Sequence, residues 1–337
     1  MNSIYVNAVN CHVGGGKTLL DSFLSGLEFY DNLYFYIFVD DRYKHPVIIN
    51  KNIYIYKVNK FNRIFVSKKI KNNILLVDKV LFFGNLPPLL GFENNIVYLL
   101  LSSRFYVDKV SFKGFQFKDI LKIFLEKVYF NMFKSNVNKF IVQSYSMKNL
   151  LDKVIPSENI FVWPFENSNL FVNNNFQKEK FSFIYVASLI PYKNHRRLLE
   201  AWFLLKKQGL NPALYLTIDQ NNSIKKWIYE FVKANDLNVI FLENISREKL
   251  ISVYQNVEFL IYPSYFEAYG LPLIEAKNFN LKILCSDLDY CWEFISPSDF
   301  FNPFDIHSIS RCVSRCFNKN GSKIEILSPE KFINNII

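Results

Sequence analysis

Short apolar segments of strand length alternate with helix-length segments along almost the whole chain. This alternation is typical of parallel sheets whose connecting helices cover both faces. In the first half, strands are predicted at Ser3–Ala8, Leu33–Val39, Asn52–Val58, Val80–Phe83, Ile96–Leu101 and Lys139–Val142. In the second half, strands are predicted at Phe183–Ala187, Ala213–Ile218, Val239–Leu242, Glu258–Tyr262 and Lys282–Cys285. The pattern therefore predicts an α/β fold.

An Asn-rich, turn-prone stretch at residues 167–175 interrupts this series, which starts again after it. With 337 residues, the chain also exceeds the size of one ordinary hydrophobic core. We therefore expect two doubly wound domains, residues 1–170 and residues 171–337, with the last helix free to pack back on the first domain. Two such domains that face each other form a central cleft at the carboxyl ends of both sheets.

The formal net charge of +10 predicts attraction to anions. Charge alone does not choose between nucleic acid, an anionic membrane face and phosphorylated small molecules. A basic nucleic-acid-binding module is the non-enzymatic alternative, but the sequence contains no nucleic-acid recognition motif. We therefore expect no nucleic-acid partner.

The cysteines and the apolar stretches indicate the cellular compartment of the protein. The odd number of cysteines and the lack of a C-x-x-C pair argue against a disulfide framework and a zinc site. The cysteines are Cys11, Cys285, Cys291, Cys312 and Cys316. The longest apolar stretches are strand-sized, whereas a membrane span needs about 20 residues. The N-terminal segment Met1–Val6 resembles a first strand rather than a signal peptide. These features predict a cytoplasmic protein.

Two glutamates, Glu267 and Glu275, enclose a glycine and a proline in one short run. A continuous helix is disfavoured here, because Pro272 would clash with the carbonyl of Ala268 and Gly270 would weaken the turn. A loop that leads into a new helix near Pro272 fits better. Glu267 then lies on the loop and Glu275 about one turn inside the helix. The N–H groups at the helix start attract phosphate.

A glycine loop, Gly14-Gly15-Gly16, follows the first predicted strand and leads into an amphipathic segment. Such a loop lets backbone N–H groups approach an anion closely. A nucleoside-triphosphatase P-loop is disfavoured, because its pattern needs glycine where Cys11 stands. A tight turn without any ligand is the other alternative.

A basic loop follows the first predicted strand of the second half and carries Lys193, Arg196 and Arg197. Lys193 would project from the carboxyl end of that strand, where a diphosphate binds in this architecture. The alternative is a solvated basic helix start. Three cations at a helix N-terminus oppose the helix dipole unless an anion joins them, which favours an anion site.

These three loops together resemble glycosyltransferase family 4, retaining nucleotide-sugar transferases of the two-domain B-type fold. The run F-E-A-Y-G-L-P-L-I-E-A contains Glu267 and Glu275 and matches the E-x7-E signature of the family. The segment from Ala187 to His195 resembles the G-R-L to K-N loop, and the glycine loop resembles its N-terminal counterpart. The resemblance is continuous from about Phe181 to Phe304. The segments 83–89 and 103–106 are similar to members that build lipopolysaccharide or capsule sugars.

The resemblance implies two Rossmann-like domains facing a central cleft and a role for each matched residue. Glu267 would lie beside the donor sugar as the catalytic residue, and Glu275 would accept hydrogen bonds from the ribose. The diphosphate would be held by Lys193 and by the N–H groups around Gly270 and Leu271. On the donor side, the remaining expected residues are Gly15, Gly16, Ser188 and Arg196. On the acceptor side, they are His12, Ser102, Ser103 and Arg104.

The sequence departs from the family pattern at two places. A histidine often follows the first-domain strand near Leu99 to Ser102, and this chain has none, so Ser102 or Ser103 is expected to face the acceptor instead. Ser188 stands where the family commonly has arginine, so Arg196 or Arg197 is expected to reach in. The implied partners are a nucleotide sugar and a glycan or undecaprenyl-diphosphate-linked acceptor of surface polysaccharide synthesis. No metal or cofactor is expected.

Three enzymatic alternatives use the same residues differently. Asp287-Leu288-Asp289 matches the D-x-D motif of metal-dependent glycosyltransferases, although a helix-capping loop is the preferred interpretation. The glutamate pair could serve a glycoside hydrolase, but such enzymes need no diphosphate-binding loops. Another nucleotide-sugar enzyme of the same fold, such as an epimerase, is the third alternative.

The segment Phe112–Lys134 combines many large apolar residues with five lysines. It is either a helix packed on the sheet with solvated lysines or a basic amphipathic contact with an anionic membrane surface. The second option would place the protein peripherally on the inner face of the cell membrane. Three histidines, His45, His195 and His307, are expected at the surface, and Cys312 and Cys316 are expected in the core.

Overall fold

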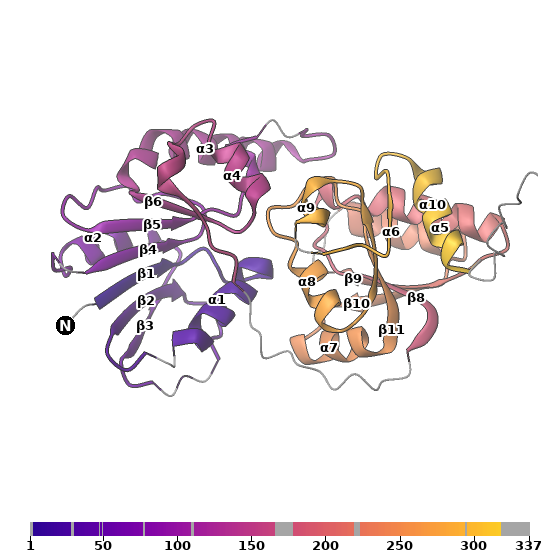
Figure 1. Cartoon of the computed structure of the whole chain (residues 1–337), viewed down its shortest axis with the longest axis horizontal. Coiled ribbons are helices and arrows are strands. Elements are labelled where there is room, and N and C mark those ends of the chain that lie inside the picture. The colour runs from indigo at the N-terminus through magenta and orange to yellow at the C-terminus, as the bar shows by residue number, and fades with distance from the viewer. Residues whose placement is uncertain are drawn as a thin grey trace, which may run out of the picture.

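The computed structural model describes residues 3–27, 30–46, 48, 50–76, 78–108, 111–165, 178–218, 223–293 and 295–317. Its strands form two parallel sheets, one of seven strands and one of six. Figure 1 shows the two sheets in separate halves of the molecule, which lie side by side. The predicted α/β fold with two domains is therefore present. The expected boundary at residue 170 falls outside the described residues.

The first sheet has the strand order β3-β2-β1-β4-β5-β6-β7. Its strands are β1 (Ser3–Ala8), β2 (Tyr34–Asp40), β3 (Ile53–Val58), β4 (Lys79–Phe83), β5 (Ile96–Leu100), β6 (Lys139–Val142) and β7 (Ile160–Val162). The order reverses between β1 and β4, and the connections therefore leave a crevice there, at the carboxyl ends of the strands.

The second sheet repeats this arrangement in the order β10-β9-β8-β11-β12-β13. Its strands are β8 (Glu179–Tyr185), β9 (Ala213–Ile218), β10 (Val239–Glu243), β11 (Val257–Tyr262), β12 (Lys282–Ser286) and β13 (Asp299–Phe301). The reversal falls between β8 and β11, so the loops after these two strands meet at one crevice.

Helices connect the strands on both faces of each sheet. In the first domain they are α1 (Gly14–Gly26), α2 (Val66–Lys71), α3 (Phe117–Phe133) and α4 (Tyr145–Leu151). In the second domain they are α5 (His195–Lys207), α6 (Ser223–Ala234), α7 (Arg247–Asn256), α8 (Leu271–Asn278), α9 (Asp289–Trp292) and α10 (Ile306–Phe317). The last of these, α10, packs on α5 within the second domain. In the described part of the chain, no helix is long and apolar enough to span a membrane.

All predicted strands are present, and most differ from the prediction by one residue or less at each end. The largest difference is β8, which begins at Glu179 rather than Phe183, because polar residues at its exposed start hide the pattern. Two strands, β7 and β13, were not predicted. Each has only three residues, which is too short for a recognisable alternation.

Alternating side chains of the first sheet enter two separate clusters of buried residues. Tyr5 of β1 packs with Val80, Val97 and Phe140 on one face. The next residue, Val6, packs on the other face with the buried leucines of α1. Both faces are therefore covered, as a doubly wound sheet requires. The second domain has one continuous core in which Phe183 and Phe259 stack with ring centroids 4.7 Å apart.

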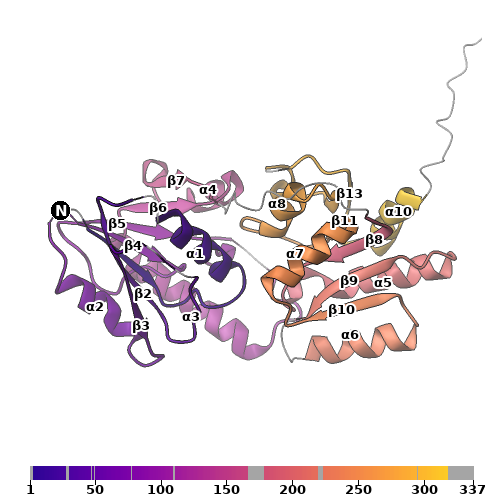
Figure 2. The ribbon, with the colours of Figure 1, turned by 90° about the horizontal axis from the view of Figure 1, so that it is seen from below.

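Polar contacts join the two domains beside α4. The Ser144 hydroxyl donates a hydrogen bond to the carbonyl of Ala268 at 2.8 Å. The Glu293 carboxylate accepts hydrogen bonds from the backbone N–H groups of Tyr145 at 2.6 Å and Ser146 at 2.8 Å. A carboxylate from the second domain thus satisfies the N-terminus of a helix in the first. In both ribbon views, α1 and α7 face each other across the space between the domains (Figures 1 and 2).

Candidate active site

A cleft of about 920 Å³ lies between the two domains. The first domain contributes the glycine turn, the loop after β5 and the residue that follows β6. The second domain contributes the loops after β8, β10 and β11, the end of β9 and the start of α8. The cleft therefore lies at the carboxyl ends of both sheets, where the sequence predicts it.

Gly270 sets the direction of α8 at the floor of this cleft. Its φ of +74° and ψ of +48° place it in the left-handed region that glycine adopts without strain. A Cβ at this position would meet Leu273 Cδ1 at 3.0 Å. Pro272 occupies the first turn of α8, as predicted, and no side chain in the described part of the chain caps the helix start. The positive end of the α8 dipole therefore faces the cleft.

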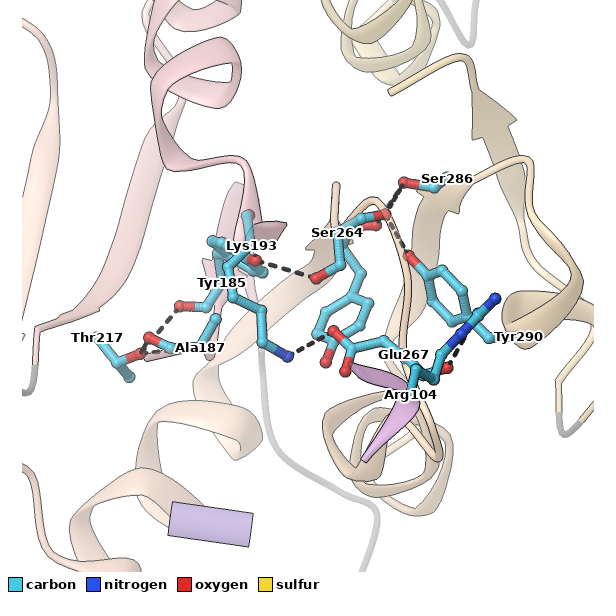
Figure 3. Close-up of polar contacts among 10 residues, drawn as sticks. Arg104, Tyr185, Ala187, Lys193, Thr217, Ser264, Glu267, Ser286 and Tyr290 are labelled. Atoms are coloured by element: carbon cyan, nitrogen blue, oxygen red, sulfur yellow. Dashed lines mark hydrogen bonds and ion pairs between the residues drawn. The ribbon is translucent and has the colours of Figure 1, made fainter. Parts of the chain in front are cut away.

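Lys193 and Glu267 form a buried ion pair in front of α8. The Nζ–Oε1 distance is 2.5 Å, and the two residues are 9% and 8% exposed. Figure 3 shows the two side chains pointing toward each other from separate loops. Burial disfavours the charge on Lys193, but the Glu267 carboxylate outweighs it and raises the pKa of the ammonium group. Lys193 is therefore a cation at neutral pH.

The backbone around Lys193 is held by Asn194, which has φ of +61°. Its Nδ2 donates hydrogen bonds to the carbonyls of Pro263 at 3.0 Å and Pro303 at 2.9 Å. The Lys193 carbonyl accepts a hydrogen bond from the buried Tyr185 hydroxyl at 2.5 Å. The loop that carries the cation is therefore anchored to the core of the second domain.

Glu275 is buried one turn inside α8, as the sequence predicts. Arg247 Nη1 donates to Glu275 Oε1 at 2.7 Å, and the Tyr254 hydroxyl donates to Oε2 at 3.0 Å. Arg247 lines the cleft and was missed in the sequence. The sequence does contain a signal for Arg247. Ser246 caps the start of α7 shortly after β10, and this cap places the next residue, Arg247, at the carboxyl edge of the sheet.

Four cations line the cleft among the described residues, and a carboxylate pairs with each. Besides Lys193 and Arg247, Lys17 pairs with Asp21 at 2.5 Å and Arg104 with Asp108 at 2.8 Å. The positive charge is thus held in place by fixed partners rather than left to flexible side chains. Ser188 lines the cleft but contributes no charge.

The structure does not bring Arg196 or Arg197 into the part of the cleft lining that it describes. Arg196 is exposed, and its guanidinium lies 4.4 Å from the centre of the Trp227 ring in α6. Arg197 instead lies over the ring of Tyr265 and hydrogen-bonds to its hydroxyl. The first turn of α5 directs both side chains away from the described cleft lining, so this geometry does not support the expectation that Arg196 or Arg197 replaces the missing arginine.

Gly15 and Gly16 line the cleft from within the first turn of α1, rather than from a loop before it. A Cβ on Gly15 would lie 3.7 Å from Leu271 Cδ1, so the starts of α1 and α8 face each other closely. In the described residues, no side chain caps α1 either. Two uncapped helix N-termini converging on one space favour an anionic ligand.

The residues expected on the acceptor side divide into two groups. Ser102, Ser103 and Arg104 line the cleft after β5, and Figure 3 shows Arg104 beside Glu267. His12 is absent from the described lining. Its Nδ1 lies 3.9 Å from Asp40 Oδ2 at the end of β2, and burial, with nearby arginines, lowers its pKa. The tight turn after β1 directs His12 toward β2.

The structure also places the remaining histidine, aspartate and cysteine residues singled out in the sequence. His195 is buried rather than at the surface, and burial, with the nearby Lys193 charge, lowers its pKa to about 3. Asp287 accepts a hydrogen bond from Trp292, and neither it nor Asp289 is in the described cleft lining. All five cysteines are buried, and none forms a disulfide. Among the described residues, no group of three His, Cys, Asp or Glu could hold a metal ion.

Comparisons with known proteins identify the family of the chain. The family described as "Glycosyl transferases group 1" matches residues 166–335, half of the chain. The serotype-specific mannosyltransferase WbdA of Escherichia coli is 33% identical over 109 residues, which cover 32% of this chain and 13% of that protein. The capsular polysaccharide biosynthesis glycosyltransferase CapH of Staphylococcus aureus is 27% identical over 250 residues, covering 70% and 66%.

Solved structures show the same fold at lower identity. Sucrose-phosphate synthase from Thermosynechococcus elongatus superposes with a TM-score of 0.70 at 14% identity, covering 95% of this chain and 91% of that one. At this identity, the similarity concerns the fold alone. Because the chain matches only 13% to 16% of the length of the WbdA proteins, their activity does not transfer directly to it.

Proposed function

The chain belongs to the group 1 glycosyl transferases and is a glycosyltransferase with two Rossmann-like domains of the B-type fold, and from this premise we propose its reaction. It transfers a sugar from a nucleotide-diphosphate donor to a glycan acceptor, with retention of the anomeric configuration. The observation that carries this proposal is the buried pair of Lys193 and Glu267 in front of the α8 N-terminus.

The donor diphosphate would bind where the starts of α1 and α8 face each other. Both helix dipoles favour negative charge at this point, and Lys193 adds a full positive charge beside it. Glu275 would accept hydrogen bonds from the ribose hydroxyls, with Arg247 and Tyr254 holding its carboxylate in position. The nucleoside therefore lies against the second domain in this proposal.

Transfer breaks the bond between the anomeric carbon and the diphosphate oxygen and forms one, on the same face of the sugar, to an acceptor oxygen whose hydroxyl proton passes to the leaving diphosphate. Negative charge develops on the leaving diphosphate, where Lys193 and the α8 N-terminus stabilise it. Positive charge develops on the sugar ring, and in this proposal the Glu267 carboxylate stabilises it. We propose that this charge arrangement needs no metal ion, because protein cations and helix N-termini already oppose the diphosphate.

The acceptor would be a lipid-linked or oligosaccharide glycan of surface polysaccharide synthesis. This part of the proposal is supported by the similarity to WbdA, a serotype-specific mannosyltransferase, and to CapH, a glycosyltransferase of capsular polysaccharide biosynthesis. Ser102, Ser103 and Arg104 would lie on the acceptor side, because they line the cleft from the first domain.

A peripheral contact with an anionic membrane would bring the enzyme to such an acceptor. Six apolar residues on α3 are between 40% and 79% exposed, and their spacing of 4, 3, 1, 3 and 4 residues places them on one helix face. They are Phe117, Leu121, Phe124, Leu125, Val128 and Met132. Five lysines against two acidic residues in segment 112–134 add attraction to anionic lipid.

A donor panel tests the proposed reaction. The protein is incubated with UDP- and GDP-sugars, with and without an oligosaccharide acceptor, and the release of nucleoside diphosphate is measured. Acceptor-dependent release that persists in EDTA is expected, with the product anomer matching the donor by NMR. Loss of transfer on chelation, restored by Mn²⁺, would contradict the metal-free mechanism, and an inverted product would contradict retention. Cleavage of ordinary oligosaccharides without nucleotide would favour a hydrolase.

A further inference from the structure

Gln143 is a buried polar residue whose amide has no partner in the described protein. The residue is 1% exposed, and neither its Oε1 nor its Nε2 forms a hydrogen bond with any described residue. It nevertheless lines the interdomain cleft. A buried amide without hydrogen bonds destabilises a folded protein, so such a group at the wall of a cleft indicates a missing ligand.

The backbone on both sides of Gln143 is fixed. Its predecessor, Val142, ends β6 and pairs with β7 through a hydrogen bond from the Trp163 N–H at 3.0 Å. Its successor, Ser144, caps α4 and also donates to the Ala268 carbonyl of the second domain. Gln143 is thus held beside the loop that carries Glu267, and its amide cannot find a partner through a simple shift of the backbone.

The position of Gln143 in the cleft separates it from the glycine turn. The glycine turn follows β1, whereas Gln143 follows β6, three strands farther along the first sheet. Its neighbour across the strand pair is the loop after β5, where Ser102 donates its hydroxyl to Asn85. Ser102 and Gln143 are themselves uncharged, and the cation on the loop after β5, Arg104, is paired with Asp108.

An amide offers two donors and one acceptor oxygen with two lone pairs. A phosphate can only accept and would leave Oε1 without a partner, whereas hydroxyl groups both donate and accept. We propose that Gln143 binds a pair of hydroxyl groups of a neutral sugar in the cleft. This inference rests on the proposed glycosyl transfer. The hydroxyls belong to the donor sugar or to the terminal sugar of the acceptor, which share this chemistry.

The test replaces Gln143 by leucine, which keeps similar bulk and removes every hydrogen bond. Gln116→Leu is the matched control, because Gln116 is exposed and is not in the described lining of the cleft. Affinities for UDP, GDP, UDP-glucose and GDP-mannose are measured by titration calorimetry, and KM values for donor and acceptor by steady-state kinetics. Melting temperatures of the ligand-free proteins report on the unpaired amide itself.

Gln143→Leu is expected to leave the affinity for UDP and GDP unchanged and to raise the melting temperature of the ligand-free protein. If the donor sugar is the ligand, the affinity for UDP-glucose or GDP-mannose falls about fivefold or more, while that for UDP and GDP does not. If the acceptor is the ligand, only the acceptor KM rises by that factor. The control variant changes none of these quantities.

Three results would overturn the inference. Unchanged donor affinity together with an unchanged acceptor KM would mean that the amide contacts water only. An equal loss for nucleotides and nucleotide sugars would assign Gln143 to the nucleoside or to the shape of the cleft. A lower melting temperature with unchanged sugar binding would assign it a structural role. If wild-type protein bound none of the four probes, the proposed function would fail, and this inference with it.

Discussion

Lys193 Nζ and Glu267 Oε1 lie 2.5 Å apart, with about nine-tenths of each residue removed from solvent. Both charges lose hydration, so each depends on the other, and removing one leaves an uncompensated buried charge. A donor diphosphate would give Lys193 a second anionic partner. Ligand binding and the stability of this pair are therefore linked, which makes conservative substitutions the informative ones.

Replacing Glu267 by glutamine should lower kcat by about 10²-fold or more, because the negative charge beside the sugar disappears while the side-chain shape stays. The fold should remain intact, since the amide oxygen can still accept a hydrogen bond from Lys193. Turnover and circular dichroism measure the two effects. Glu230→Gln, on the exposed face of α6, is the control. Near-normal turnover of Glu267→Gln would refute the catalytic role.

Replacing Glu275 by alanine should mainly weaken donor binding, by about tenfold or more, and affect kcat less. The carboxylate is the group proposed to hold the ribose, and its loss also leaves Arg247 and Tyr254 without their partner. We therefore expect unfolding to become easier by about 2 kcal/mol. Titration calorimetry with UDP and GDP and urea unfolding measure both quantities. An unchanged donor affinity would count against the ribose contact.

Replacing Gly270 by alanine should destabilise the protein by about 1–2 kcal/mol, because a left-handed backbone is costly for an L-residue. The new Cβ would also press on Leu273 Cδ1 and displace the start of α8. Gly209→Ala is the matched control, since Gly209 has φ of +81° but no described atom within 4 Å of its Cβ position. Donor affinity should fall only for Gly270→Ala. Equal affinities in both variants would show that α8 tolerates the change.

Replacing Phe124 and Leu125 by glutamine should weaken sedimentation with anionic liposomes, because the exposed apolar face of α3 loses two large side chains. The same double change at Leu75 and Leu76 is the control, since both are more than 60% exposed and lie outside α3. Binding of the wild type should decrease with salt. Sedimentation that is absent even at low salt, or is equally affected by both variants, would remove the membrane contact.

His195 should make the native state less stable at acid pH. Its folded pKa of about 3 lies below the ordinary value of 6.5, so between these values only the unfolded chain binds the proton. The contribution of His195 to the free energy of unfolding is complete above pH 6.5. Below pH 6.5 it falls by about 1.4 kcal/mol per pH unit. Urea unfolding at pH 7.5 and 5.5 measures this slope. His195→Phe should flatten it, whereas the exposed His307→Phe should not. Equal slopes would exclude His195 as the source.

The fold and the outline of the site could be predicted from local patterns. Three patterns depend only on neighbours in sequence and can be recognised without knowledge of tertiary contacts. They are the alternation of strands and helices, the interruption near residue 170, and the glycine and proline at Gly270 and Pro272. The same holds for the positions of Lys193, Glu267 and Glu275. Lys193 and Glu267 lie on loops that follow strands, Glu275 lies in the first turns of the next helix, and strand ends of a doubly wound sheet meet at one edge.

The direction of individual side chains depended on the tertiary structure. Arg196 turns to Trp227, and His12 turns to Asp40, although each stands within three residues of one that lines the cleft. One step along a helix rotates a side chain by about 100°, so sequence proximity does not determine which space it enters. The pairing of Arg247 with Glu275 and the unpartnered amide of Gln143 arise only when distant loops meet, because hydrogen bonding is decided by the neighbours that folding supplies.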